Sequence, residues 1–154
     1  MARGLSDLQK KILLMAYERR RSNPRDFAAE RAEAERFMRS FNSEYTYTPR
    51  ADITCAEILA EVYGWRHRWK FPAELAERDR QQGHKPSQNY HHNSQYFYRR
   101  AIGEEEYNKA TTTVWRSAKR LEARGLARAR TSGKAGVCLT DEGVEAARRL
   151  SVTK

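Results

Sequence analysis

The chain has 154 residues, 39% of them hydrophobic, so it is long enough to bury a core and too apolar to stay disordered. Its 30 Lys and Arg against 20 Asp and Glu give a net charge of +10, which favours nucleic acid or an anionic membrane surface as the partner. The apolar runs are too short for a membrane span or a signal peptide, and Cys55 and Cys138 are too few for a disulfide-rich secreted scaffold. We therefore expect a soluble cytoplasmic protein whose thiols are free and buried.

The N-terminal part of the sequence predicts two amphipathic helices. In "LSDLQKKILLMAYERRR", Ser6 and Gln9 have the spacing of a capping box, and apolar residues then recur on one helical face. In "SNPRDFAAERAEAERFMRSFN", Asn23 is the expected N-cap and Pro24 the first helical residue. The apolar stripe of this second helix is thinner and consists of Phe27, Ala34, Met38 and Phe41.

The next part predicts a short strand and a third helix. Aromatic residues alternate with threonines over residues 44–48, which is typical of a strand, and Pro49 ends the run. The segment "ITCAEILAEVYGW" then begins a helix, with Thr54 and Glu57 as a capping box and Gly64 as the expected stop.

Residues 65–106 are polar, aromatic and basic, and we expect them to form an insertion between core helices of one domain that spans residues 1–154. The insertion places aromatic side chains next to arginines: Tyr90, Tyr96, Phe97, Tyr98, Arg99 and Arg100. Such side chains could stack on unpaired bases. They could instead form a small separate core or a dimer contact, and we favour these two alternatives over base stacking.

Four histidines, His67, His84, His91 and His92, raise the hypothesis of a metal site. Their spacing matches no known zinc motif, and adjacent histidines on a strand cannot easily bind one ion, so we interpret them as loop residues. The acidic run at 104–106 suits the N-terminus of a helix, where carboxylates are favourable, and no Gly-rich phosphate loop or nucleophile elbow occurs in the sequence. We therefore expect no metal, no cofactor and no enzymatic activity.

The C-terminal part returns to regular periodicity. It predicts a helix over about residues 108–124, which Gly125 ends as a C-cap. Residues 127–138 predict a hairpin with a basic, Gly-containing tip, and Thr140 is the expected cap of a last helix. The core-facing stripe of the 108–124 helix consists of Ala110, Val114, Ala118 and Leu121.

The stretch "TVWRSAKRLEARGLARAR", followed by "GVCLTDEG", resembles the recognition helix, wing and closing helix of the MarR-like winged-helix regulators. The matching pieces are RLExRGL, LTxEG and the short basic wing between them, within residues 109–150. The resemblance implies a mainly α fold with a small β-hairpin wing, a winged helix-turn-helix that here carries an inserted segment. It also implies a transcriptional regulator that binds duplex DNA. Trp115 stands where such regulators usually have a small hydroxyl residue, and we expect it to be half-buried against the insertion.

Residues 109–134 contain eight basic side chains and a single acid, Glu122. With the apolar stripe turned to the core, we expect the outer face of the helix to read the major groove. Thr112 and Thr113 would contact base edges and thymine methyls, and Arg116 would fork onto a guanine. The other cations suit phosphates or the minor groove. These expected contacts are Lys109, Lys119, Arg120, Arg128, Arg130 and Lys134.

We expect the protein to act as a homodimer on double-stranded DNA at the nucleoid, without a membrane partner. Such modules gain specificity by pairing two half-sites, and the first, second and last helices each carry an apolar stripe. Two other functions stay open. One is a protein-interaction module that docks partners through the wing and the insertion, and the other is a single-strand or RNA binder that uses the Tyr-rich insertion.

Overall fold

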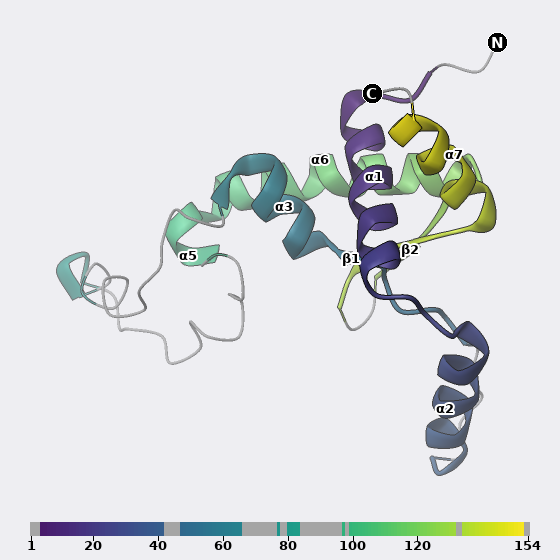
Figure 1. The fold of residues 1–154 in the computed structure, drawn as a ribbon. Coiled ribbons are helices and arrows are strands. Elements are labelled where there is room, and N and C mark those ends of the chain that lie inside the picture. The colour runs from purple at the N-terminus through teal and green to yellow at the C-terminus, as the bar shows by residue number, and fades with distance from the viewer. Residues whose placement is uncertain are drawn as a thin grey trace. The chain divides into compact units, whose positions relative to one another are not determined.

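The computed structural model describes residues 4–41, 47–65, 77, 80–83, 97, 99–131 and 134–152. These residues are mainly helical and include a small antiparallel sheet of three strands, which agrees with the expected class at this level (Figure 1). The chain divides into two compact units: the sheet unit, residues 1–54 with 116–154, and the aromatic unit, residues 55–115. Within the described part of the chain, each helix is too short or too polar to span a bilayer.

Two helices form the scaffold of the sheet unit. Helix α1 (Asp7–Ser22) begins with the expected capping box, in which Ser6 Oγ accepts the N–H of Gln9 at 3.2 Å and Gln9 Oε1 accepts that of Ser6 at 3.0 Å. Helix α7 (Asp141–Val152) lies beside α1, and both helices contact the sheet (Figure 1). The apolar side chains that the two helices bury are Ile12, Leu13, Ala16 and Ala147.

Helix α2 (Phe27–Arg39) starts later than expected. Its N-cap is Asp26, and the prediction of Asn23 as cap and Pro24 as first residue is wrong. The backbone N–H of Asn23 instead donates to a carbonyl in the last turn of α1 and closes that helix. The guanidinium of Arg25 makes ion pairs outside the local chain, so tertiary contacts override the local start signal here. All thirteen residues of α2 are described, and none of them is buried.

The sheet has the strand order β1-β3-β2, and both pairings are antiparallel. The expected hairpin is confirmed as β2 (Ala127–Arg130) and β3 (Gly136–Leu139). The third strand, β1 (Ile53–Thr54), lies where we expected a helix cap. The expected strand at 44–48 is wrong for residues 47–48, which are irregular, and its first three residues lie outside the described residues.

Helix α6 (Glu104–Ala123) contributes to both units and ends as predicted. Gly125 has φ +74°, a conformation that favours glycine, and the N–H of Leu126 donates back to the carbonyl of Leu121 at 3.0 Å. Thr140 caps α7 as expected, because its Oγ accepts the N–H of Gly143 at 3.1 Å. The predicted stripe of α6 is confirmed: Ala110, Val114, Ala118 and Leu121 are all buried.

The aromatic unit contains α3 (Cys55–Tyr63), the short α5 (Arg99–Ile102) and the first part of α6. Gly64, with φ +68°, follows the last residue of α3 as expected. The ring of the buried Trp65 lies 5.0 Å from that of Phe97 and 6.3 Å from that of Tyr107, measured between centroids. Phe97 therefore belongs to a small core, as we favoured, whereas Tyr90, Tyr96 and Tyr98 lie outside the described residues.

Candidate nucleic-acid interface

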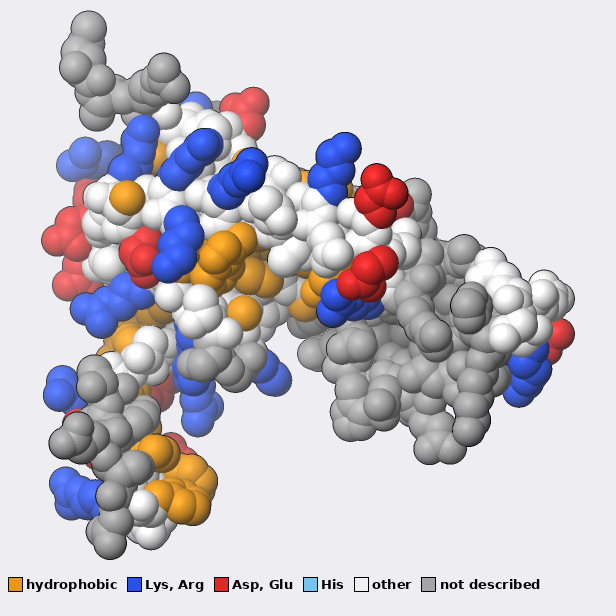
Figure 2. All heavy atoms as spheres, turned by 180° about the vertical axis from the view of Figure 1, so that it is seen from behind, with side chains coloured by type: hydrophobic (Ala, Val, Ile, Leu, Met, Phe, Trp, Pro, Cys, Tyr) orange, Lys and Arg blue, Asp and Glu red, His pale blue; other side chains and the backbone are white. Residues whose placement is uncertain are grey.

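The second half of α6 separates an apolar side from a cationic side. Ala118 and Leu121 are fully buried, while Arg116, Lys119 and Arg120 are exposed. In the view of Figure 2, α6 faces the reader, and Lys and Arg side chains project along it. The helix thus offers cations to solvent on the side opposite its core contact, which is the arrangement that a groove-reading helix needs.

Glu122, the single acid of this basic stretch, has a structural role. Its Oε2 accepts the N–H of Ala129 in β2 at 2.9 Å, and its Oε1 lies 3.3 Å from Lys119 Nζ. The hydrogen bond from Ala129 lowers the pKa of Glu122, and the ammonium of Lys119 lowers it further. Glu122 therefore ties the end of α6 to the hairpin. The ammonium of Lys119 is partly neutralised by this carboxylate.

Lys109, Thr112 and Thr113 lie on the part of α6 that belongs to the aromatic unit, and all three are exposed. The hydroxyl of Thr112 donates to the carbonyl of Asn108 at 2.8 Å, and that of Thr113 donates to the carbonyl of Lys109 at 3.0 Å. Both hydroxyl protons are thus used within the helix, so the two side chains can offer only methyl groups and acceptor lone pairs. Trp115 is half-buried, as expected, and its packing against the insertion stays a prediction.

The arginines of the hairpin lie on one face of β2, because residues two apart in a strand point the same way. Arg128 pairs with Cys138 across the strands, and Arg130 pairs with Gly136. Arg128 lines a broad hollow together with Phe27 of α2 and the start of α7, and Arg130 lines a second hollow against α2. The structure thus places Arg128 and Arg130 on the α2 side of the sheet, a neighbourhood that the sequence did not suggest.

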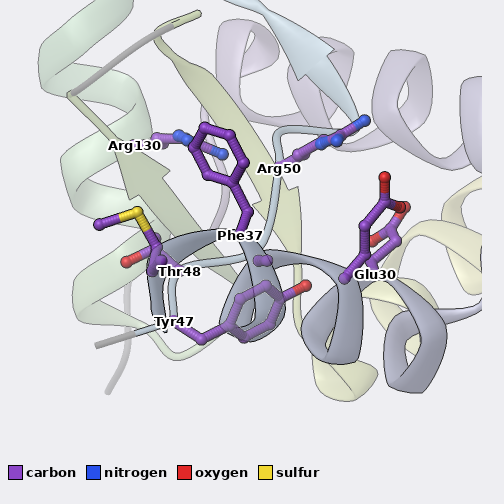
Figure 3. A pocket seen from close by; sticks show the side chains of 9 residues that line it. Glu30, Phe37, Tyr47, Thr48, Arg50 and Arg130 are labelled. Carbon is purple, nitrogen blue, oxygen red and sulfur yellow. The ribbon is translucent and has the colours of Figure 1, made fainter. Parts of the chain in front are cut away.

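Arg50 joins the candidate site although no pattern in the sequence indicated it. Together with Arg130 and Lys134 it lines a hollow of about 320 Å³ beside the hairpin, completed by Ala51 and Thr54. Arg50 and Arg130 also line the neighbouring hollow of about 370 Å³, where the ring of Phe37 points toward them (Figure 3). The signal that could have found Arg50 is its position three residues before β1, but β1 itself was not predicted.

A buried carboxylate holds this region together. The side chain of Asp52 is 0% exposed and accepts four hydrogen bonds. Its Oδ1 accepts from Arg20 Nε at 3.0 Å and from Arg25 Nη1 at 2.8 Å, and its Oδ2 accepts from Arg20 Nη2 at 2.6 Å and from the N–H of Leu139 at 2.8 Å. Asp52 therefore links α1, the segment before α2 and β3 through one side chain.

Arg25 extends this cluster toward Arg50. Its Nη2 lies 2.7 Å from Glu30 Oε2, and its Nη1 donates to the backbone carbonyl of Arg50 at 2.9 Å as well as to Asp52. Burial by itself lowers the pKa of Arg25, but the hydrogen bonds to Glu30 and Asp52 raise it above its ordinary value. The guanidinium is thus permanently charged and fixes the backbone from which the Arg50 side chain projects.

The cysteines are free, and Cys138 is buried whereas Cys55 is only half-buried. Burial raises the pKa of Cys55 to about 11 and also raises that of Cys138. Within the described ranges, the His, Cys, Asp and Glu side chains form no group of three that could hold a metal ion. The four histidines of the metal hypothesis, His67, His84, His91 and His92, lie outside those ranges.

Comparison with known proteins gives no relative: no protein-family model, no curated protein and no solved structure matches the chain.

Proposed function

We propose that the protein is a sequence-specific, duplex DNA-binding regulator of transcription with a winged helix-turn-helix fold. In this proposal α6 is the recognition helix and the β2–β3 hairpin is the wing. The element order α1, β1, α3, α6, β2, β3, α7 and the sheet order β1-β3-β2 are those expected of such a fold with additional segments. The observation that carries the proposal is the row of exposed cations on α6, directly before a hairpin that adds further cations.

The side chains divide into two roles. Arg116 has the planar fork that matches a guanine edge, a pair worth about 1–3 kcal/mol of discrimination against other bases. Thr112 and Thr113, whose hydroxyl protons are engaged, would contact thymine methyl groups. The remaining cations would bind phosphates, which position the protein without reading sequence. These proposed phosphate ligands are Lys109, Lys119, Arg120, Arg128, Arg130 and Lys134.

The test compares Arg116→Ala with Lys134→Ala on a duplex selected by the wild type from a random pool, and on random duplex. Arg116→Ala should bind both duplexes alike, whereas Lys134→Ala should lose affinity for both by a similar factor. Arg148→Ala is the matched control, since this exposed arginine of α7 pairs with Glu145 at 2.6 Å and lies outside the proposed interface. Equal losses for Arg116→Ala and Lys134→Ala on both duplexes would contradict the division of roles.

We also propose that the protein binds DNA as a homodimer and that α2 forms the contact between the two copies. The stripes of α1 and α7 face each other inside the sheet unit. Helix α2 and the turn after it, by contrast, expose Phe37 by 64% and Phe41 by 61%, with their ring centroids 5.2 Å apart. Figure 2 shows the hydrophobic side chains gathered over this helix. A solvent-facing pair of aromatic rings is typical of an interaction surface.

The charges of α2 favour a second copy as the partner. A two-fold dimer brings the same surface of both subunits together, so an antiparallel α2 pair sets the beginning of one helix against the end of the other. The two ends differ in charge: Asp26 caps the start and Arg36 and Arg39 lie in the last turn, whereas Arg31 and Glu35 between them pair with each other at 2.9 Å. The helix is therefore complementary in charge to its own antiparallel copy.

Sedimentation over a wide concentration range tests the dimer. We expect the wild type to dimerise and the double variant Phe37→Ser, Phe41→Ser to stay monomeric. The variant Val152→Ser, which removes an apolar side chain that is 73% exposed on α7, should dimerise like the wild type. A wild type that remains monomeric throughout, or a Val152→Ser variant that fails equally, would contradict the α2 contact.

The alternative functions receive less support. A single-strand binder would stack bases on the aromatic insertion, but Phe97 is buried. The guanidinium of Arg99 covers the ring of Tyr107 at 4.4 Å and pairs with Glu104 at 2.6 Å. A protein-interaction module has the exposed rings of α2 in its favour, and we assign that surface to a second copy of the chain.

A further inference from the structure

We infer that Arg50, Arg130 and Lys134 together bind one phosphate group of the DNA backbone, in the hollow of about 320 Å³ that they line. The inference rests on the proposed function, because it assumes that the protein binds duplex DNA. It adds a contact from the segment before β1, which belongs neither to the proposed recognition helix nor to the hairpin.

Gly136 allows Arg50 and Arg130 to line the same hollow. Thr54 of β1 and Arg130 of β2 both pair with Gly136, from opposite sides of β3. A Cβ atom on Gly136 would overlap the carbonyl oxygen of Ile53 and would lie 2.7 Å from the Cβ of Ala51. Residues 51–54 can therefore lie directly against β3 only because position 136 has no side chain. This contact lets Arg50 line the same hollow as Arg130 of β2.

The backbone of this segment is anchored at Arg50 and at Asp52. The N–H of Asp52 donates to the carbonyl of Val137 at 2.8 Å, and the Asp52 side chain is the buried acceptor described above. The carbonyl of Arg50 accepts from Arg25, whose own side chain is only 12% exposed. The Arg50 side chain thus projects from a fixed position. Less conformational entropy is lost on binding when the supporting groups are already held in place.

The charges that line the hollow favour the binding of an anion. Three cations line it, and none of its described lining residues is a carboxylate. Glu30 and Glu33 line the neighbouring hollow, which Arg50 and Arg130 also line (Figure 3). A phosphate can accept the forked N–H groups of arginine together with the N–H groups of a lysine ammonium. The site therefore suits a phosphate better than a base edge.

The salt dependence of duplex binding tests the inference. Loss of one phosphate contact should make the slope of log K against log salt shallower by about 0.9, and it should weaken binding about fivefold at ~0.15 M salt. We expect this change for Arg50→Ala and expect no change for the control Arg148→Ala. Arg50 is exposed, so the substitution should leave the unfolding transition where it is in the wild type.

A double-variant comparison separates a shared phosphate from a general loss of charge. If Arg50 and Lys134 bind the same phosphate, the double variant Arg50→Ala, Lys134→Ala should lose much less than the product of the two single losses. Arg50→Ala combined with Arg120→Ala should lose the full product, because these side chains would bind different phosphates. Multiplicative losses in both pairs would overturn the shared site.

The remaining outcomes distinguish this inference from the proposed function. A wild type that does not bind duplex DNA at low salt would overturn the proposed function and this site with it. A wild type that binds with a steep salt dependence, while Arg50→Ala matches the control, would overturn the site alone. Loss of binding to anionic phospholipid vesicles in Arg50→Ala, with duplex binding unchanged, would assign the hollow to a lipid headgroup and overturn the DNA contact.

Discussion

Replacing Asp52 by asparagine keeps the size of the side chain but removes its charge. Four N–H groups converge on the two carboxylate oxygens, so the amide nitrogen of asparagine would face donors and not acceptors. The guanidinium groups of Arg20 and Arg25, on side chains only 17% and 12% exposed, would then lack this counter-charge. Removing one partner of a buried ion pair typically destabilises a protein by about 3–5 kcal/mol.

Urea and thermal unfolding measure this loss. For a chain of this size, about 3–5 kcal/mol corresponds to a decrease in Tm of roughly 6–20 °C. Hydrogen exchange at the amide of Leu139, which loses its acceptor, should become faster by the factor that corresponds to the same loss of free energy. The control is Glu18→Gln, which removes an exposed carboxylate that lies 3.7 Å from Arg21 and should change stability by less than about 1 kcal/mol. If Asp52→Asn and Glu18→Gln destabilise equally, the buried cluster does not hold the sheet unit together.

Two further predictions concern titratable groups. The folded pKa of Glu122 is lowered, so its contribution is present at neutral pH and lost as the pH falls through that lowered pKa. Glu122→Gln keeps an oxygen that can accept from Ala129 and removes only the charge of a side chain that is 39% exposed, so it should cost about 0.5 kcal/mol in urea unfolding near neutral pH and almost nothing in acid. A loss that persists in acid would contradict this assignment. With a pKa of about 11, the Cys55 thiol should be only about one part in a thousand thiolate at pH ~8. Both Cys55 and Cys138 should thus react slowly with a thiol reagent until urea unfolds the chain, and rapid reaction of either thiol in the native protein would refute its raised pKa.

Elements with a long, regular pattern could be predicted from the sequence. Ser6 and Gln9 identify the start of α1 through contacts within one turn, and the α6 stripe repeats often enough to define its buried face. In both cases the residues that carry the signal are the residues that make the contact. The prediction of the start of α2 was wrong for the opposite reason. The partner that keeps Arg25 out of the helix is Asp52, which lies far along the chain.

The same limit explains why Arg50 was missed. Strand β1 has only two residues, and it is a strand because Ile53 and Thr54 pair with β3, more than eighty positions later. A local pattern contains no trace of that pairing. The cationic residues of α6 and the hairpin could be recognised by their density, whereas the contribution of Arg50 depends on a glycine that lets two distant segments touch.

The salt dependence of wild-type binding to duplex DNA tests the central claim most directly. Phosphate contacts by Lys109, Lys119, Arg120 and Arg128, and by the hollow of Arg50, Arg130 and Lys134, would give five contacts for each protomer. They predict that log K falls with log salt with a slope of about −4.5 per protomer. Affinity that hardly changes between low and physiological salt, or the absence of binding to duplex DNA at low salt, would contradict the account.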